Sequence, residues 1–279
     1  MQLKLHPVAP GQGLRWIRQG LALWWRRPMA FVGLFVLFFV VVSPLMALLP
    51  LVGVVLGVAM LPMLTLGFMV AARSASSDGP VHALQLLDGL RTPDKSRRRS
   101  QWALCAAYAA CSLLAFWLAD LADGGTFDAL QRALAQVKPG ADHAEVDALL
   151  ADPRLAWGMV VRFGLIALLS VPFWHAPALV HWGGQGLTQA LFSSTLAIWR
   201  ARSAFTLYML GWSALVMAVS IIVTLLVVLT GSRQWMGWIS MPAGLALSAA
   251  FYVSLWFSFA DCFVREDAVV QAPSSPTAP

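Results

Sequence analysis

Runs of about 20 apolar residues recur along this chain of 279 residues and constrain its fold more than any other feature. An α-helix rises about 1.5 Å per residue, so a run of that length crosses a hydrocarbon layer about 30 Å thick. Apolar residues make up 59% of the chain and charged residues 11%. Soluble domains have about 45–50% and about 25%, so too few charges remain to cover a soluble surface. We predict an all-α, polytopic membrane helix bundle.

The apolar runs define six predicted spans, arranged as three hairpins. Pro50 separates the first two spans. The fourth is interrupted by Pro172 and Pro177, so we expect it to kink or end near Trp174. The predicted organisation is an N-terminal interfacial helix (1–28), a hairpin (29–72), a basic cytoplasmic loop (73–100), a second hairpin (101–182) with an outer helical segment (123–155), an interfacial helix (183–203), a third hairpin (204–265) and a disordered cytoplasmic tail (266–279).

The orientation follows from the distribution of basic residues, because cytoplasmic loops near span ends carry the excess of Lys and Arg. With the N-terminus inside, 14 Lys and Arg residues fall on the inner side and 4 on the outer side. We therefore expect both termini in the cytoplasm of a bacterial cell and the spans in its inner membrane.

Short amphipathic segments precede the hairpins. Leu14, Ile17, Leu21 and Trp24 recur at helical spacing, which is typical of a helix lying in the membrane plane. Similar segments precede the third and fifth spans. One interpretation is a threefold repeat of interfacial helix plus hairpin. The alternative is that cytoplasmic loops entering a membrane are commonly basic and amphipathic.

Several short motifs resemble a family of uncharacterised polytopic inner-membrane proteins of proteobacteria. The motifs are Trp16, Arg18, Gln19 and Gly20; Arg26, Arg27 and Pro28; Leu48, Leu49 and Pro50; Leu66, Gly67 and Phe68; and Ala176, Pro177, Ala178, Leu179 and Val180. The resemblance covers most of the chain and implies the polytopic fold, but it supplies no activity. The outer segment 123–155 and His175, where an aromatic residue is expected, depart from the family pattern.

Arg162 is a charge inside the fourth span, and such a charge costs about 3 kcal/mol on insertion scales. Asp120, near the outer end of the third span, lies at a comparable depth, so the two form a candidate intramembrane polar pair. The pair either lines a polar pathway or is a structural ion pair; Arg162 could also extend outward to the interface. Asp261 and Arg265 have the spacing of a helical ion pair.

Two further groups are candidate contacts. Gly53 and Gly57 form a GxxxG pattern that permits close helix packing, within the chain or in a dimer. The basic residues of the inner side are candidate contacts for anionic lipids, or only determine topology. They are Arg15, Arg18, Arg26, Arg27, Lys95, Arg97, Arg98 and Arg99.

No catalytic motif supports an enzyme, and the three cysteines lack the spacing of a metal or redox site. We expect no cofactor and no bound metal. The net charge of +6 is spread along span edges, which argues against nucleic-acid binding. The leading hypothesis is a non-enzymatic scaffold that binds membrane lipids or another membrane protein. The alternative is a small transporter or permease with a pathway near Arg162.

Overall fold

The computed structural model describes residues 3–136, 144–231 and 234–265, and the side chains of 234–237 and 265 are not described. Six helices in these ranges are long and apolar enough to cross a membrane. The prediction of an all-α, polytopic bundle with six spans is therefore confirmed. The predicted disordered tail at 266–279 lies outside the described residues.

The first unit consists of α1 (Gln12–Arg26), α2 (Pro28–Leu48) and α3 (Pro50–Ser76). Pro28 and Pro50 begin α2 and α3, where the missing proline N–H is not needed for a helical hydrogen bond. Only Leu49 separates the two spans, so they form a tight hairpin. A Cβ atom on Gly53 would meet the backbone of Leu45 and Met46. Gly53 thus allows α3 to approach α2 closely within the chain.

The second unit has an additional helical segment between its two spans. Its elements are the 3₁₀ helix η1 (Ala83–Leu87), α4 (Asp88–Arg91), α5 (Lys95–Asp123), α6 (Thr126–Gln136), α7 (Ala144–Leu150), α8 (Pro153–Phe173) and α9 (Ala176–Gly183). Helix α5 begins six residues before the predicted span at Gln101, because the Asp94 side chain accepts hydrogen bonds from the N–H groups of Ser96 and Arg97. Basic residues of the predicted loop therefore occupy the first turns of α5.

The fourth span is broken near Trp174, as the positions of Pro172 and Pro177 predicted. Helix α8 ends at Phe173 and α9 begins at Ala176, with Pro177 in its first turn. The N–H of His175, at the break, donates a 3.1 Å hydrogen bond to the Ser194 hydroxyl, which donates to the carbonyl oxygen of Val171. The polar backbone groups released by the break are thus partly satisfied by α10.

The third unit consists of α10 (Leu187–Arg200), α11 (Arg202–Thr230) and α12 (Gln234–Cys262). After α12, strand β2 (Phe263–Arg265) pairs antiparallel with strand β1 (Leu3–Leu5), with Leu5 opposite Phe263. No pattern in the sequence predicted this two-stranded ribbon. Because α12 ends at Cys262, Arg265 is in a strand, and the predicted helical ion pair of Asp261 with Arg265 was wrong.

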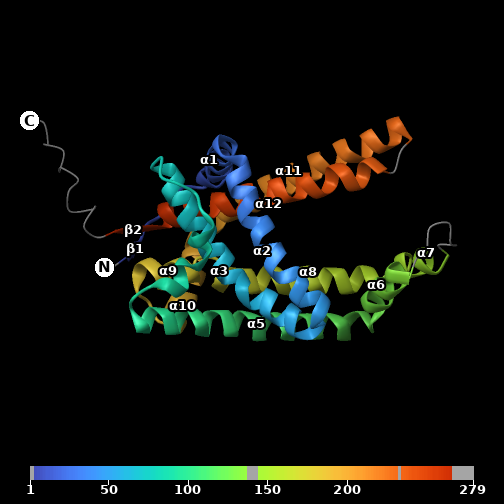
Figure 1. Cartoon of the computed structure of the whole chain (residues 1–279), viewed down its shortest axis with the longest axis horizontal. Coiled ribbons are helices and arrows are strands. Elements are labelled where there is room, and N and C mark those ends of the chain that lie inside the picture. Colours follow the sequence, from blue (N-terminus) through green and yellow to red (C-terminus); the bar gives the residue numbers. More distant parts are fainter. Residues whose placement is uncertain (1–2, 137–143, 232–233, 266–279) are drawn as a thin grey trace, which may run out of the picture.

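The longer of the short helices, α1 and α10, and the 3₁₀ helix η1 pack mainly against a hairpin other than the one they lead into. Helix η1 packs on α3, α10 packs on α8 and α9, and α1 packs on α12 and α11 (Figure 1), whereas α4 lies between α3 and α5. The order of short helix and hairpin recurs along the chain, and the short helix of each unit contacts the hairpin of the preceding unit, with the first unit contacting the third. Of the predicted stripe on α1, Ile17 is buried, Leu21 and Trp24 pack against the core, and only Leu14 is exposed; Trp16 and Gly20 complete the buried face.

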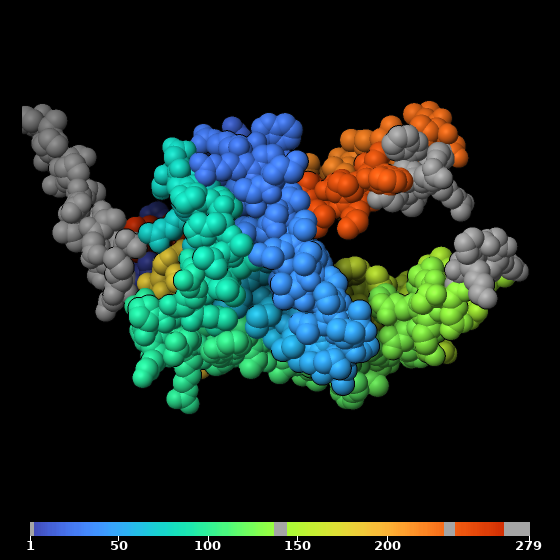
Figure 2. Space-filling view, in the orientation of Figure 1, coloured from blue at the N-terminus to red at the C-terminus, as the bar shows by residue number. Residues whose placement is uncertain are grey.

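The three hairpins meet near α3 and diverge from there. Helix α3 contacts both α5 and α12, and the α11–α12 hairpin extends away from the α5–α8 hairpin (Figure 1). Figure 2 shows open space between the outer halves of these two hairpins. The point where all three hairpins meet therefore lies at the base of an open, apolar cleft.

Candidate functional site

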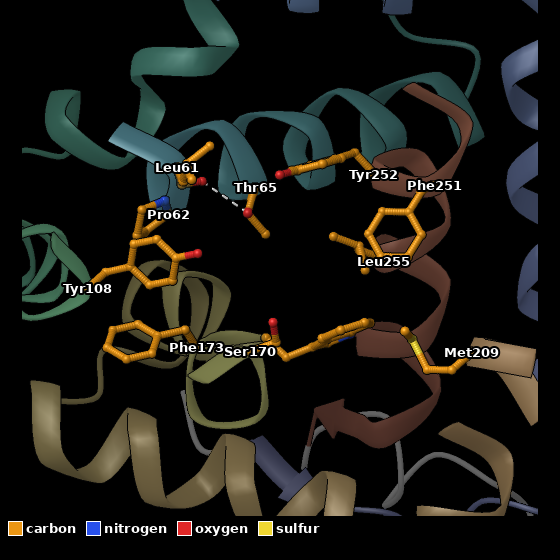
Figure 3. Close-up of a pocket in the computed structure, with 11 residues that line it drawn as sticks. Leu61, Pro62, Thr65, Tyr108, Ser170, Phe173, Met209, Phe251, Tyr252 and Leu255 are labelled. Atoms are coloured by element: carbon orange, nitrogen blue, oxygen red, sulfur yellow. Dashed lines mark hydrogen bonds between the residues drawn. The ribbon is translucent and has the colours of Figure 1, made fainter. Parts of the chain in front are cut away.

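A cavity of about 200 Å³ lies where the three hairpins meet, and we call it the central pocket (Figure 3). Helices from every hairpin contribute to its wall. The lining residues are Leu61, Pro62, Thr65, Tyr108, Ser170, Phe173, Trp174, Met209, Phe251, Tyr252 and Leu255. The pocket exists because hairpins two and three diverge here, leaving space that no side chain fills.

The polar atoms of the central pocket belong to neutral side chains. The hydroxyl groups of Tyr108, Ser170 and Tyr252 are turned toward the cavity in Figure 3. Thr65 donates a 3.0 Å hydrogen bond to the carbonyl oxygen of Leu61, and Ser170 donates a 2.8 Å bond to that of Ile166. Such bonds to the preceding helical turn are usual for Ser and Thr in apolar surroundings. Among the described residues, none that lines the pocket carries a formal charge.

The central pocket adjoins a wider groove on the third hairpin. Met209, Phe251 and Tyr252 line both spaces, and the groove has a volume of about 550 Å³. Its other lining residues come from α11 and α12 and are mainly apolar, namely Trp212, Ser213, Val216, Met217, Leu247 and Ser248. Pocket and groove are therefore neighbours that share one wall, formed by Met209, Phe251 and Tyr252.

A charged cluster lies further out, between α5 and α8. The structure places Arg162 beside its expected partner Asp120, with Nη2 2.6 Å from Oδ1. It adds Asp123, whose Oδ2 is 3.5 Å from the same nitrogen, and the Phe127 ring, whose centroid is 4.1 Å from the guanidinium carbon. The Asp123 side chain is inaccessible to solvent. Two carboxylates and an aromatic face therefore stabilise this cation within its span.

Sequence reasoning missed Asp123 because it assigned this residue to the outer helical segment (123–155) rather than to the third span. The three-residue spacing of Asp120 and Asp123 places both on one helix face, and that signal could have identified the cluster. Gly158 allows this packing, because a Cβ there would collide with the Asp123 side chain.

The candidate lipid-binding cations divide into two groups. Arg15, Arg18, Arg26, Lys95, Arg98 and Arg99 are exposed. Arg27, by contrast, donates to the carbonyl oxygens of Gly79 and Asp78. The Nη1 of Arg97 donates to the carbonyl oxygen of His181 at 3.0 Å, and its Nε lies 3.2 Å from Asp94 Oδ2. These two arginines connect segments that are far apart in the sequence.

Gly53 and Gly57, the other candidate packing residues, both face α2. A Cβ on Gly57 would lie 2.9 Å from the Cγ1 atom of Val42, and Gly53 meets the α2 backbone. The GxxxG pattern therefore serves the first hairpin, one of the two arrangements that the sequence left open.

His175, which departs from the family pattern, is completely buried. Its Nε2 lies 3.1 Å from the Ser258 hydroxyl, and the ring contacts those of Phe205, Phe259 and Phe263. The histidine thus occupies an aromatic position in the core and joins α9 to α12.

Comparison with known proteins is consistent with this architecture. No protein-family model and no solved structure matches the chain. The chain is 31% identical to a probable inner membrane protein of Burkholderia thailandensis over 277 residues, which cover 99% of this chain and 98% of that protein. Residues that carried the resemblance, including Trp16, Phe68 and Leu179, are fully buried at contacts between helices. The chain belongs to the family of polytopic membrane proteins that includes this probable inner membrane protein of Burkholderia.

Proposed function

We propose that this protein is a non-enzymatic scaffold of the bacterial inner membrane that binds lipid in its central pocket. The observation that carries this proposal is the position of the pocket. It lies at the base of diverging apolar hairpins and adjoins a groove along α11 and α12. A lipid tail could enter from the side without leaving the hydrocarbon layer.

The exposure of the spans supports a role in contacting other membrane components. Only 6% of the most apolar stretch of α11 is buried within the chain. The corresponding value for the fourth span is 11%. In an ordinary compact bundle more of each helix would pack on its neighbours, so these faces are available to lipid or to another membrane protein.

The exposed basic residues of α1 and α5, namely Arg15, Arg18, Arg26, Lys95, Arg98 and Arg99, form what we call the basic rim. This basic rim supports the orientation with both termini in the cytoplasm. The β1–β2 ribbon holds the two ends of the described chain on the same side, and the exposed arginines and lysine of α1 and α5 belong to that side's basic excess. Each such residue near an anionic lipid surface contributes about 1 kcal/mol to its attraction. The rim would thus stabilise the orientation and recruit anionic headgroups.

A transport pathway at Arg162 is supported less well. The guanidinium is held by Asp120, Asp123 and Phe127. As far as the described residues show, Arg162 does not line the central pocket. We therefore interpret the charged cluster as a joint between α5 and α8.

The test is lipid retention in native membrane discs. The tagged chain is extracted with its surrounding lipid, and bound lipids and proteins are identified by mass spectrometry, with an unrelated six-span protein as control. Ser170→Phe fills the pocket, and Leu168→Phe, at an exposed position of the same helix, is the matched control. We expect specific lipids that Ser170→Phe removes and Leu168→Phe retains. Equal lipid content in both variants, or none above the control protein, would overturn the proposal.

A further inference from the structure

We infer that the central pocket selects an uncharged lipid whose polar part is a hydrogen-bond acceptor, a carbonyl or ester group. This inference rests on the proposed lipid-binding function and specifies its ligand. The lipid's polar part would occupy the hydroxyl-lined pocket, and its chain would follow the adjoining groove.

The depth of the pocket excludes a charged headgroup. Thr65 lies eleven residues before the end of α3 at Ser76, and Phe251 lies eleven residues before the end of α12 at Cys262. At 1.5 Å per residue, both are about 16 Å along the helix from its inner end. A phosphate at this depth would need a cationic partner. Among the described lining residues there is no arginine, lysine or histidine to supply one.

The hydrogen-bonding state of the wall favours an acceptor over a donor. The protons of Thr65 and Ser170 are already donated to helix carbonyls. Trp174 also lines the pocket, and its buried indole N–H has no hydrogen-bond partner among the described residues. The Tyr108 and Tyr252 hydroxyls enter from opposite walls (Figure 3). Their neighbours are the hydroxyls of Ser112 and Thr65, and each tyrosine can rotate its proton from that neighbour toward a ligand. This wall is rich in donors, so a carbonyl oxygen is the complementary group.

The size of the space fits the polar part of a lipid rather than a whole lipid. An apolar cavity of about 150 Å³ binds benzene. The central pocket, at about 200 Å³, holds a single substituted ring or a glycerol ester, and the groove of about 550 Å³ takes the attached chain. Two classes of membrane lipid have this chemistry, the isoprenoid quinones and the diacylglycerols.

The experiment compares three probes on the purified full-length chain in detergent, using native mass spectrometry to count bound molecules. The probes are decylubiquinone, dioleoylglycerol and, as the charged comparison, dioleoylphosphatidylglycerol. The test variant is Tyr108→Phe with Tyr252→Phe, which removes both hydroxyls and keeps the rings. The matched control is Tyr208→Phe, since Tyr208 bonds to Ser254 in the core and does not line the pocket. Thermal unfolding of each variant checks that it is folded.

We expect one of the two neutral probes to bind, and the probe that binds identifies the source of the carbonyl group. The double tyrosine variant should weaken this binding at least about tenfold, as expected for the loss of one or two hydrogen bonds, whereas Tyr208→Phe should not. Neutral-probe binding that Ser170→Phe abolishes but the double variant leaves unchanged would overturn the role of the hydroxyls. Binding of the phospholipid alone, sensitive to Ser170→Phe, would overturn this inference and leave the proposed function intact. If Ser170→Phe alters the binding of none of the probes and of no native lipid, both proposals fail.

Discussion

The indole Nε1 of Trp16, in the first helix, donates a 2.7 Å hydrogen bond to Oδ2 of Asp261, one residue from the end of the last span. Trp16 is completely buried between α11 and α12 and contacts the rings of Phe205 and Tyr208. Gly20, one turn later, packs directly on Ser254. The N-terminal helix is therefore an integral part of the core of the third hairpin.

Replacing Trp16 with Phe should destabilise the protein. The change leaves the Asp261 carboxylate without its indole donor, and a hydrogen bond to a charged group contributes about 1.5–3 kcal/mol. Thermal unfolding in detergent should show a lower midpoint. Trp25→Phe, at an exposed position of α1, is the control and should have little effect. Equal midpoints for the two variants would show that the hydrogen bond contributes no net stability.

Replacing Arg162 with Leu should be among the most damaging single substitutions. It leaves the inaccessible Asp123 carboxylate unpaired, and breaking a buried ion pair from one side costs about 3–5 kcal/mol. Arg154→Leu, at an exposed position of α8, should be tolerated. Adding Asp123→Asn to Arg162→Leu should restore part of the loss, because it removes the unpaired charge. A folded, fully stable Arg162→Leu protein would contradict a structural role for the cluster.

Replacing Gly53 with a larger residue should force α3 away from α2 in the first hairpin. A Val side chain there would collide with the α2 backbone at Leu45 and Met46, and overpacking of this kind costs about 1–3 kcal/mol or more. Gly33→Val, in α2, meets no atom within 4 Å and is the matched control. The comparison requires only the yield and unfolding midpoint of the two purified variants. Loss of dimerisation with unchanged stability in Gly53→Val would instead indicate an interface between copies.

The orientation can be measured by labelling single cysteines. In a chain whose native cysteines are replaced by Ala, Arg98→Cys should react only with reagents that reach the cytoplasm, and Arg132→Cys should react from outside. Both positions are exposed, so burial does not limit labelling. Reaction of both from the same side would contradict the orientation and the proposed role of the basic rim.

Neutralising the exposed basic residues at the start of α5 should weaken the attraction of the protein to anionic lipids without unfolding the chain. Replacing Lys95, Arg98 and Arg99 with Gln should reduce the amount of anionic lipid that co-purifies. The reason is that each basic residue near an anionic surface contributes about 1 kcal/mol to the attraction. Arg97→Gln should instead lower the unfolding midpoint, because Arg97 joins α5 to the carbonyl of His181. If Arg97→Gln and the triple variant behaved alike, the distinction between the two groups of cations would be wrong.

Hydropathy predicted the parts of the fold that depend on local sequence. Long apolar runs marked the spans, Pro50 the tight first hairpin, and Pro172 with Pro177 the broken fourth span. The proximity of Arg162 and Asp120 was also accessible, because a buried charge demands a partner at its own depth.

Contacts between distant segments were not accessible in the same way. The amphipathic pattern of α1 shows that one face is buried but not which helices cover it, and small residues such as Gly20 shifted the real face away from Leu14. The central pocket depends on how three hairpins diverge. Tyr108 and Tyr252 both line it, although their helices are far apart in the sequence. The periodicity of one helix does not predict which residues of another helix lie beside it.

The contact of α1 with α12 also has a consequence for synthesis. Trp16 and Asp261 are 245 residues apart, so at about 5–20 residues per second a ribosome needs roughly 10–50 s to make the second after the first. Until α11 and α12 have been made, the face of α1 that contains Trp16 lacks the helices that bury it and must be covered by lipid headgroups or by a chaperone. The nascent chain is therefore most vulnerable to proteolysis at its oldest end, until the last helix inserts.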